Sequence, residues 1–293
     1  MAVHATLKWG VERRLEFIEF RLFWEGAVNR VDIIDRFDVS VPQASKDLTL
    51  YQEVAPGNAV YDKSAKRYVP GDDFRPKYLD PDPDQYLSRM RSVGEGLVTE
   101  EDNWISSLPA IDIVVTPKRR VSPSVLKAVL QAVRERRSLT VLYQSMNREQ
   151  TEPQLRQISP HAFGFDGFRW HTRAFCHDTQ KYKDFLLPRI LDVGAKGAVD
   201  DTARFDRLWN ERFDIVVGPH PDLTASQKKV VELDFGMTDG SLTLSVRYAM
   251  LFYALKRLGL LNATELQSPR TQHIVALNRD MLNAAIQQSQ IIL

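Results

Sequence analysis

Three residues that can carry positive charge alternate along the segment from residue 168 to residue 175. Arg169, His171 and Arg173 occupy every second position of Phe-Arg-Trp-His-Thr-Arg-Ala-Phe. Because alternate side chains of a β-strand point to the same face, these three would form a single row. A row of cations repels itself unless an anion or a carboxylate lies opposite it. The chemistry indicated is anion binding, and the alternative is a solvated or ion-paired sheet face.

The charge distribution along the chain favours the first interpretation. Residues 118–195 carry 14 Lys/Arg against 7 Asp/Glu, a net charge of +7, whereas the whole chain has a net charge of only +1. Residues 72–117 carry four basic and ten acidic residues, a net charge of −6. Adjacent blocks of opposite sign suggest an anion-binding region and a connector kept away from it. We therefore expect the cations of this strand to bind an anionic ligand, with Trp170 facing the core.

Further polar residues fall at the ends of neighbouring predicted strands. Residues 139–143, 158–163 and 182–187 have the composition of short strands, which together suggest a small, strongly bent sheet or barrel of Sm-like type. Tyrosine, serine, histidine and arginine side chains that converge on such a sheet can bind phosphate or another anion. The candidate ligand-binding residues are Tyr143, Ser145, His161, Arg169, His171, Arg173 and Arg189.

The residue types give little support to catalysis. The chain has no glycine-rich phosphate loop, no nucleophile elbow and no paired histidines at metal-binding spacing. Cys176, His177 and Asp178 are adjacent, so they point to different sides of the chain and cannot form one site unaided. We therefore predict no catalytic residue, no metal and no cofactor. A nucleic-acid-processing enzyme, or a ligand-binding module without operator specificity, is the alternative function.

Compartment and membrane association follow from simpler features. A single cysteine cannot form an internal disulfide, which fits a reducing environment. The N-terminus lacks the pattern of a signal peptide, and no apolar run has membrane-spanning length. We expect a soluble cytoplasmic protein with no membrane partner.

The first 70 residues have the pattern of a winged helix-turn-helix. An amphipathic helix is predicted over residues 7–24 and two short helices over 30–37 and 41–51. Asp38 to Ser40 would form the turn between the short helices, since aspartate tolerates the left-handed conformation. Residues 59–69 then predict a β-hairpin, which would be the wing. The alternatives are a three-helix packing module with a solvated hairpin, and a winged helix that serves as a protein-interaction module.

Polar and basic residues cluster on the outer side of this arrangement. They are of the types that hydrogen-bond base edges and phosphates of double-stranded DNA. Ser40 with Gln43 three residues later also has the spacing of a helix N-cap. The candidate DNA-binding residues are Ser40, Gln43, Ser45, Lys46, Thr49, Lys63, Lys66 and Arg67.

The remaining segments predict an α+β multidomain chain. The connector, residues 71–137, should contain helices over 83–92 and 122–137 and a strand over 108–116. The sheet domain would span 138–195. The C-terminal extension, 196–293, should be α+β, with a helix over 205–213, a hairpin formed by 230–235 and 241–246, a helix over 248–258 and a strand over 274–277.

The order of these parts resembles a known family. Tyr143, Pro160, the Trp170-His171-Thr172 triplet and Arg189 are similar in type and order to the marks of the WYL domain, although His171 and Thr172 replace the tyrosine and leucine of its name. The full chain resembles WYL-domain transcriptional regulators, especially the BrxR/CapW-like repressors of phage-defence operons. The resemblance implies a homodimer formed through the C-terminal extension, an inverted-repeat operator, and a WYL domain that senses a nucleotide or single-stranded nucleic acid.

Overall fold

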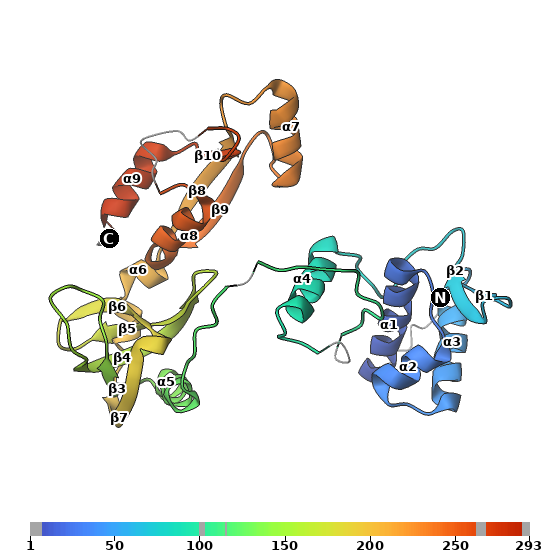
Figure 1. Ribbon diagram of the computed structural model, residues 1–293, viewed down its shortest axis with the longest axis horizontal. Coiled ribbons are helices and arrows are strands. Elements are labelled where there is room, and N and C mark those ends of the chain that lie inside the picture. Colours follow the sequence, from blue (N-terminus) through green and yellow to red (C-terminus); the bar gives the residue numbers. More distant parts are fainter. Residues whose placement is uncertain (1–7, 100–102, 115, 262–267, 289–293) are drawn as a thin grey trace, which may run out of the picture. The chain divides into compact units, whose positions relative to one another are not determined.

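The computed structural model describes residues 8–99, 103–114, 116–261 and 268–288, and the chain forms two compact units, Met1–Val115 and Thr116–Leu293 (Figure 1). The first unit contains α1 (Trp9–Glu25), α2 (Arg30–Phe37), α3 (Val41–Val54), the hairpin β1 (Ala59–Asp62) and β2 (Arg67–Pro70), and α4 (Pro83–Gly94). Three helices followed by a hairpin are the predicted winged helix-turn-helix.

Local signals determine where α2 and α3 begin and end. The side chain of Asn29 accepts hydrogen bonds from the backbone N–H groups of Val31 and Asp32, and so caps α2. Asp38 ends that helix in the left-handed conformation, with φ 48°. Ser40 then caps α3 by accepting a hydrogen bond from the backbone of Gln43. The predicted turn between the two helices is confirmed.

A buried carboxylate fastens the segment after the wing to α1. Glu19 is 0% exposed. Its oxygens accept hydrogen bonds of 2.6–2.9 Å from the backbone N–H groups of Lys77, Tyr78 and Leu79. The hydroxyl of Tyr51, on α3, donates a further bond of 3.0 Å. Because a buried charge needs such partners, Glu19 fixes this segment and α3 to the same helix.

One predicted element of the first unit is wrong. No strand forms over the described part of the predicted segment, residues 108–114 and 116, and residue 115 lies outside the described residues. Leu108 packs against the core of the first unit, whereas Val114 is 89% exposed, and none of these residues pairs with a strand. The helix expected over 83–92 is confirmed as α4, which Asp82 caps.

The second unit begins with a helix packed on a five-stranded antiparallel sheet. α5 (Pro123–Glu135) contributes Val125 and Val129 to the core of this sheet. The sheet order is β6-β5-β4-β3-β7. Its strands are β3 (Arg137–Tyr143), β4 (Gln154–Phe165), β5 (Trp170–Cys176), β6 (Lys181–Leu186) and β7 (Ile190–Val199). Register shifts between β3 and β7 and within the β4–β5 pair bend it, which confirms the predicted small bent sheet.

The C-terminal part is a three-stranded sheet with helices. Its order is β10-β8-β9 (Figure 1). The elements are α6 (Arg207–Asn210), β8 (Arg212–Pro219), α7 (Ala225–Asp234), β9 (Leu242–Arg247), α8 (Leu251–Leu258), β10 (Ile274–Ala276) and α9 (Arg279–Gln288). The predicted α+β class is therefore correct.

Two C-terminal elements differ from their predictions. The segment Val230–Phe235, predicted as a strand, lies mostly within α7, because Thr224 and Gln227 form a capping box that starts a helix there. The helix predicted over 205–213 is shorter. It is replaced from Arg212 by β8, whose alternate residues Phe213 and Ile215 enter the core. The partners of β8 are β9 and β10, which both lie far along the chain, so local periodicity did not reveal this strand.

Candidate DNA and ligand sites

The outer face of α3 and the wing present the predicted cations to solvent. Lys46 on α3 and Lys63, Lys66 and Arg67 on the wing are exposed. Within the described residues, none of the four forms an ion pair with a carboxylate. Asp62 accepts hydrogen bonds from the backbone of the turn, which hold the pKa of its carboxyl below its usual value. The wing therefore carries three cations on a turn that its own backbone bonds define.

The uncharged candidates on α3 are partly engaged within the first unit. The hydroxyl of Thr49 donates to the carbonyl of Ser45, and that of Ser45 donates to the carbonyl of Val41. The amide of Gln43 donates to Asp47 at 2.9 Å. These hydroxyls can still accept hydrogen bonds, but Lys46 is the α3 candidate with no internal partner among the described residues.

A buried ion pair sets the position of α3. Asp47 is 1% exposed, and Arg14 of α1 reaches it with Nε at 2.6 Å and Nη2 at 3.1 Å. Such a two-point contact fixes direction as well as distance. Arg30, at the start of α2, is exposed and donates to the Ser45 hydroxyl at 3.4 Å. The sequence prediction missed Arg30, which lies beside the predicted DNA-binding face.

The strand β5 is oriented differently from the prediction. Trp170 is 53% exposed, so the expectation that it faces the core is wrong. His171 and Arg173 are 0% and 5% exposed, and Thr172 between them is also buried. Both faces of β5 are therefore covered, and strict alternation did not separate an apolar face from a solvated one.

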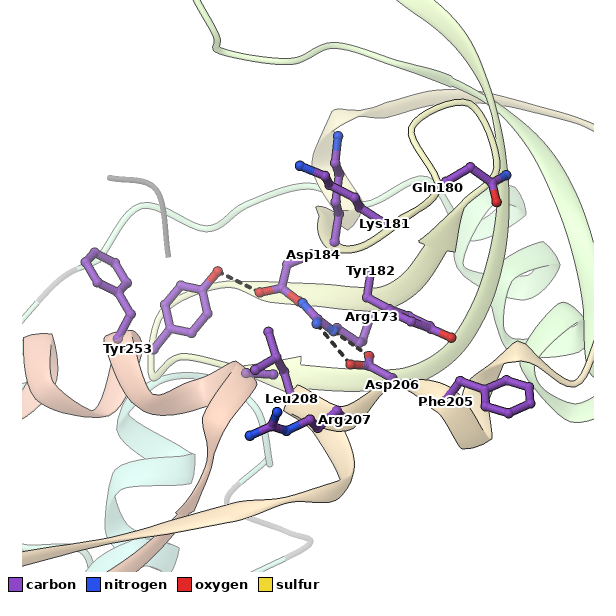
Figure 2. Close-up of a pocket in the computed structure, with 13 residues that line it drawn as sticks. Arg173, Gln180, Lys181, Tyr182, Asp184, Phe205, Asp206, Arg207, Leu208 and Tyr253 are labelled. Carbon is purple, nitrogen blue, oxygen red and sulfur yellow. Dashed lines mark hydrogen bonds and ion pairs between the residues drawn. The ribbon is translucent and has the colours of Figure 1, made fainter. Parts of the chain in front are cut away.

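The carboxylates opposite Arg173 come from two other segments. Arg173 donates to both oxygens of Asp206, with Nε at 2.7 Å and Nη2 at 3.1 Å, and to Asp184 of β6 at 3.1 Å (Figure 2). Burial alone would raise the pKa of Asp206, but hydrogen bonds from His161 and Arg173 hold that pKa below its usual value. The charge of Arg173 is thus compensated inside the protein. The sequence prediction missed both carboxylates, although Asp184 lies directly across from Arg173 in the sheet register.

The ring of His171 lies in an enclosed position. Both of its nitrogens lack a hydrogen-bond partner among the described residues, and the nearer oxygen of Asp184 is 3.9 Å from Nε2. Its ring packs at 5.1 Å on the ring of Tyr253, a residue of α8. Gly164 lies so close that an added Cβ would be 2.3 Å from Nε2. Burial lowers the pKa of His171, which favours the neutral ring.

Tyr253 connects this centre to the C-terminal helix α8. Its hydroxyl donates to Asp184 at 3.0 Å. Burial, together with the charge of Asp184, raises the pKa of Tyr253. Arg169 lies 5.9 Å from the Tyr253 ring centre and pairs with Asp166 at 2.7 Å. His161 bonds to Asp206 at 3.0 Å. Four of the seven predicted ligand residues therefore lie around an internal network.

The other predicted ligand residues lie apart from Arg173. Tyr143 is half-buried, and its hydroxyl accepts a bond of 3.3 Å from the backbone of Leu186. Burial raises the pKa of Tyr143, and the positive charge of nearby Arg189 opposes this increase. Ser145 accepts a bond from the backbone of Asn147 in the loop that follows β3. The structure thus brings Tyr143 and Arg189 together and leaves Ser145 in a separate turn.

A cavity of about 610 Å³ opens beside the Arg173 network (Figure 2). Arg173, Asp184 and Asp206 form one wall, and aromatic side chains including Phe205 and Tyr253 form others. Lys181 and Lys183 lie at its edge and are exposed. The cavity can accept a polar molecule, although its wall already contains two carboxylates.

A serine, a histidine and an aspartate meet elsewhere on the sheet. The hydroxyl of Ser159 is 2.7 Å from Nε2 of His177, and a carboxylate oxygen of Asp200 is 3.1 Å from that same nitrogen. A catalytic relay needs the carboxylate and the nucleophile on different ring nitrogens, so this cluster lacks the geometry of a relay.

Among the described residues, no group of three or more His, Cys, Asp or Glu side chains could hold a metal ion. No helix in the described part of the chain is long and apolar enough to cross a membrane.

Comparison with known families matches three consecutive regions. Residues 10–92 match the BrxR transcriptional regulator winged helix-turn-helix domain, residues 124–194 match the WYL domain, and residues 212–282 match the BrxR transcriptional regulator C-terminal dimerization domain. With the fold described above, these matches define a winged-helix protein with a central WYL sheet and a C-terminal dimerisation domain.

Full-length relatives give the family. The chain is 40% identical to the DNA-binding transcriptional repressor CapW of Stenotrophomonas maltophilia over 94% of this chain and 92% of that protein. It is 36% identical to the CapW proteins of Escherichia coli and Pseudomonas aeruginosa over 96% of this chain and 93% of each relative. The chain belongs to the CapW family. The alignment with the structure of the proteasome accessory factor B/C (PafBC) of Arthrobacter aurescens covers 96% of this chain and 48% of that chain. The sequence identity is 15% and the TM-score is 0.26, so this structure adds nothing to the assignment.

Proposed function

We propose that this chain is a homodimeric, sequence-specific DNA-binding transcriptional repressor. The observation that carries the proposal is the set of exposed cations on α3 and the wing, none of which forms an ion pair among the described residues. Lys46 would lie in the major groove with Gln43, and the cations of the wing would contact phosphates. The relatives named as DNA-binding repressors support the same function.

Selection of bound DNA from a random pool tests the proposal directly. A dimer should enrich an inverted repeat whose half-sites are separated by about 34 Å, or a multiple of it. In a gel-shift titration with the selected DNA, the combined Lys46→Ala, Lys63→Ala and Arg67→Ala variant should bind much more weakly than wild type. Unchanged binding by this variant would refute the assigned surface.

For the dimer contact we propose the exposed apolar face of α7. Val230 and Leu233 are 63% and 83% exposed, and they lie one helical turn apart within the region that matches the dimerization domain. Exposed apolar pairs of this kind favour a protein partner. The Leu233→Asp variant should be monomeric by light scattering, whereas Lys228→Asp, on the opposite side of the same helix, should remain dimeric. A dimeric Leu233→Asp variant would place the contact elsewhere.

The regulatory part of the proposal is that the second unit senses an anionic ligand, a nucleotide or a nucleic acid, and that the regulated genes form a phage-defence operon. The cavity beside Arg173 and the Tyr143–Arg189 pair support ligand binding by this unit. The choice of operon rests on the resemblance of this sequence to BrxR/CapW-like repressors of phage-defence operons. Competition of candidate ligands with operator DNA would test sensing, and operator binding unaffected by any of them would count against it.

A further inference from the structure

A second cavity of the Thr116–Leu293 unit has a different charge balance. This cavity, the basic cleft, has a volume of about 500 Å³ and four basic side chains against one carboxylate. It lies between the turn that joins β4 to β5, the segment preceding α5, and the end of α8. Its lining residues are Arg119, Asp166, Gly167, Phe168, Arg169, Tyr253, Lys256 and Arg257.

Most of the positive charge of the basic cleft is not compensated. Arg169 pairs with Asp166, the only carboxylate in the lining. Arg119, Lys256 and Arg257 form no ion pair with any carboxylate of the described residues. In the cavity beside Arg173, by contrast, two carboxylates are part of the wall. Three cations facing one cleft repel one another, and a bound anion would relieve that repulsion.

Two guanidinium groups of the basic cleft lie against uncharged neighbours. The guanidinium of Arg119 lies 4.9 Å from the centre of the Phe168 ring. Arg257 lies close to Gly167, where φ is +93° and an added Cβ would be 2.7 Å from Nη1. Because these groups lie beside a ring and a glycine rather than carboxylates, their N–H donors are not occupied by ion pairs. Guanidinium donors can bind phosphate oxygens at two points.

We propose that the basic cleft binds a clustered oligophosphate, such as the diphosphate or triphosphate group of a nucleotide. Three uncompensated cations match a group with several negative charges better than a single carboxylate. Their grouping in one cleft fits clustered phosphates better than the regularly spaced phosphates of a single strand, which bind along a groove. The inference rests on the proposed anion-sensing function and moves the anion away from Arg173 to a site that shares only Arg169 with the predicted set.

A ligand bound in the basic cleft would contact the dimerisation domain as well as the WYL domain. Tyr253, Lys256 and Arg257 belong to α8, within the matched dimerization region, while Gly167 and Phe168 belong to the WYL region. A phosphate group bound between them would join the two domains. Binding should therefore raise the unfolding temperature of the protein, because the ligand binds only the folded arrangement.

Titration calorimetry on the full chain tests the inference, with inorganic tripolyphosphate, ATP and a single-stranded oligonucleotide of about twelve residues as probes. Saturable binding of tripolyphosphate and ATP, one per chain, is expected. The paired Lys256→Ala and Arg257→Ala changes should weaken it at least about tenfold. The control pair Lys127→Ala and Arg134→Ala removes the same charges from exposed positions on α5 and should leave binding unchanged.

Arg119→Ala provides a second variant that does not depend on the packing of Arg257 against Gly167, and it should also weaken tripolyphosphate binding. No saturable binding by wild type, or equal weakening in the control pair, would overturn the inference. Binding of the oligonucleotide without binding of tripolyphosphate would assign the cleft to a nucleic-acid backbone instead, and would also overturn it. Operator gel shifts on the same samples distinguish failure of this inference from failure of the proposed repressor function. If the protein binds operator DNA but not tripolyphosphate, only the inference about the basic cleft is lost.

Discussion

The cations of the winged helix and the cations of β5 are similar in type and opposite in environment. Lys46, Lys63 and Arg67 are exposed and form no ion pair among the described residues, whereas Arg173 is 5% exposed and bonded to two carboxylates. His171, beside it, is fully buried. Basic residues in a sequence can therefore either form an exposed surface that binds an anion from solution or pair with buried carboxylates of other segments of the same chain.

The difference follows from the cost of burying a charge. An exposed lysine keeps its hydration and can exchange water for phosphate, but a buried guanidinium must be paired where it lies. Asp206, which pairs with Arg173, lies in the segment between the WYL and dimerization regions, and Tyr253 belongs to the dimerization region itself. The charges of β5 thus connect the sheet to the C-terminal part of the chain.

The largest expected effect comes from Arg173→Ala. It would leave Asp206, 1% exposed, without its main partner, and breaking such a buried pair costs about 3–5 kcal/mol. Hydrogen exchange of the β5 and β6 amides in the full chain would measure the loss. Arg169→Ala is the control, since Asp166 keeps backbone hydrogen bonds from Phe168 and Arg169, and it should cost no more than about 1 kcal/mol. Equal costs for the two changes would contradict the distinction between the buried Arg173–Asp206 pair and the partly exposed Arg169–Asp166 pair.

A pH dependence is expected from His171. Its pKa is lowered in the folded protein, so the unfolded chain binds the proton more readily from about pH 6.5 downward. Stability should be complete above that pH and should fall as the pH decreases toward the folded pKa, with a limiting slope of about 1.4 kcal/mol per pH unit. Urea unfolding between pH 8 and pH 5.5 would measure this, with the range chosen around the ordinary histidine pKa of about 6.5. His171→Gln should flatten the slope and His273→Gln, at an exposed position, should not. The same slope for wild type and His171→Gln would exclude the neutral buried ring.

A smaller effect is expected from Tyr253→Phe. The change removes the hydroxyl that donates to Asp184 at 3.0 Å, and a hydrogen bond to a charged group contributes about 1.5–3 kcal/mol. Tyr248→Phe is a matched change, since no hydrogen bond from the Tyr248 hydroxyl occurs among the described residues. Thermal unfolding of both variants would sharpen the comparison, and identical temperatures would mean that Tyr253 connects the domains through ring packing alone.

The elements with strong local signals were predictable from the sequence. Capping residues and the left-handed Asp38 define α2 and α3, and the turn at Asp62 defines the wing. Each of these signals lies within a few residues of the structure that it specifies, so no tertiary information was needed.

The features that were missed depend on distant contacts. Asp206 pairs with Arg173 across 33 residues of sequence, and the packing of α8 brings Tyr253 to the sheet. Alternation along residues 168–175 predicted that Trp170 would be buried and the cations would be open, but coverage of both sheet faces reversed this order. The strand predicted at Val230 failed because an N-cap six residues earlier started a helix.

The salt dependence of operator binding tests the central comparison most directly. The logarithm of the binding constant falls with the logarithm of salt concentration by about 0.9 for each phosphate contact. The Lys46, Lys63 and Arg67 triple alanine variant should reduce the steepness of this slope by roughly 2–3. A matched triple change, Lys127→Ala, Arg134→Ala and Lys229→Ala, removes the same types of charge from exposed positions of the second unit and should leave the slope unchanged. Equal slopes for the two variants would contradict the account.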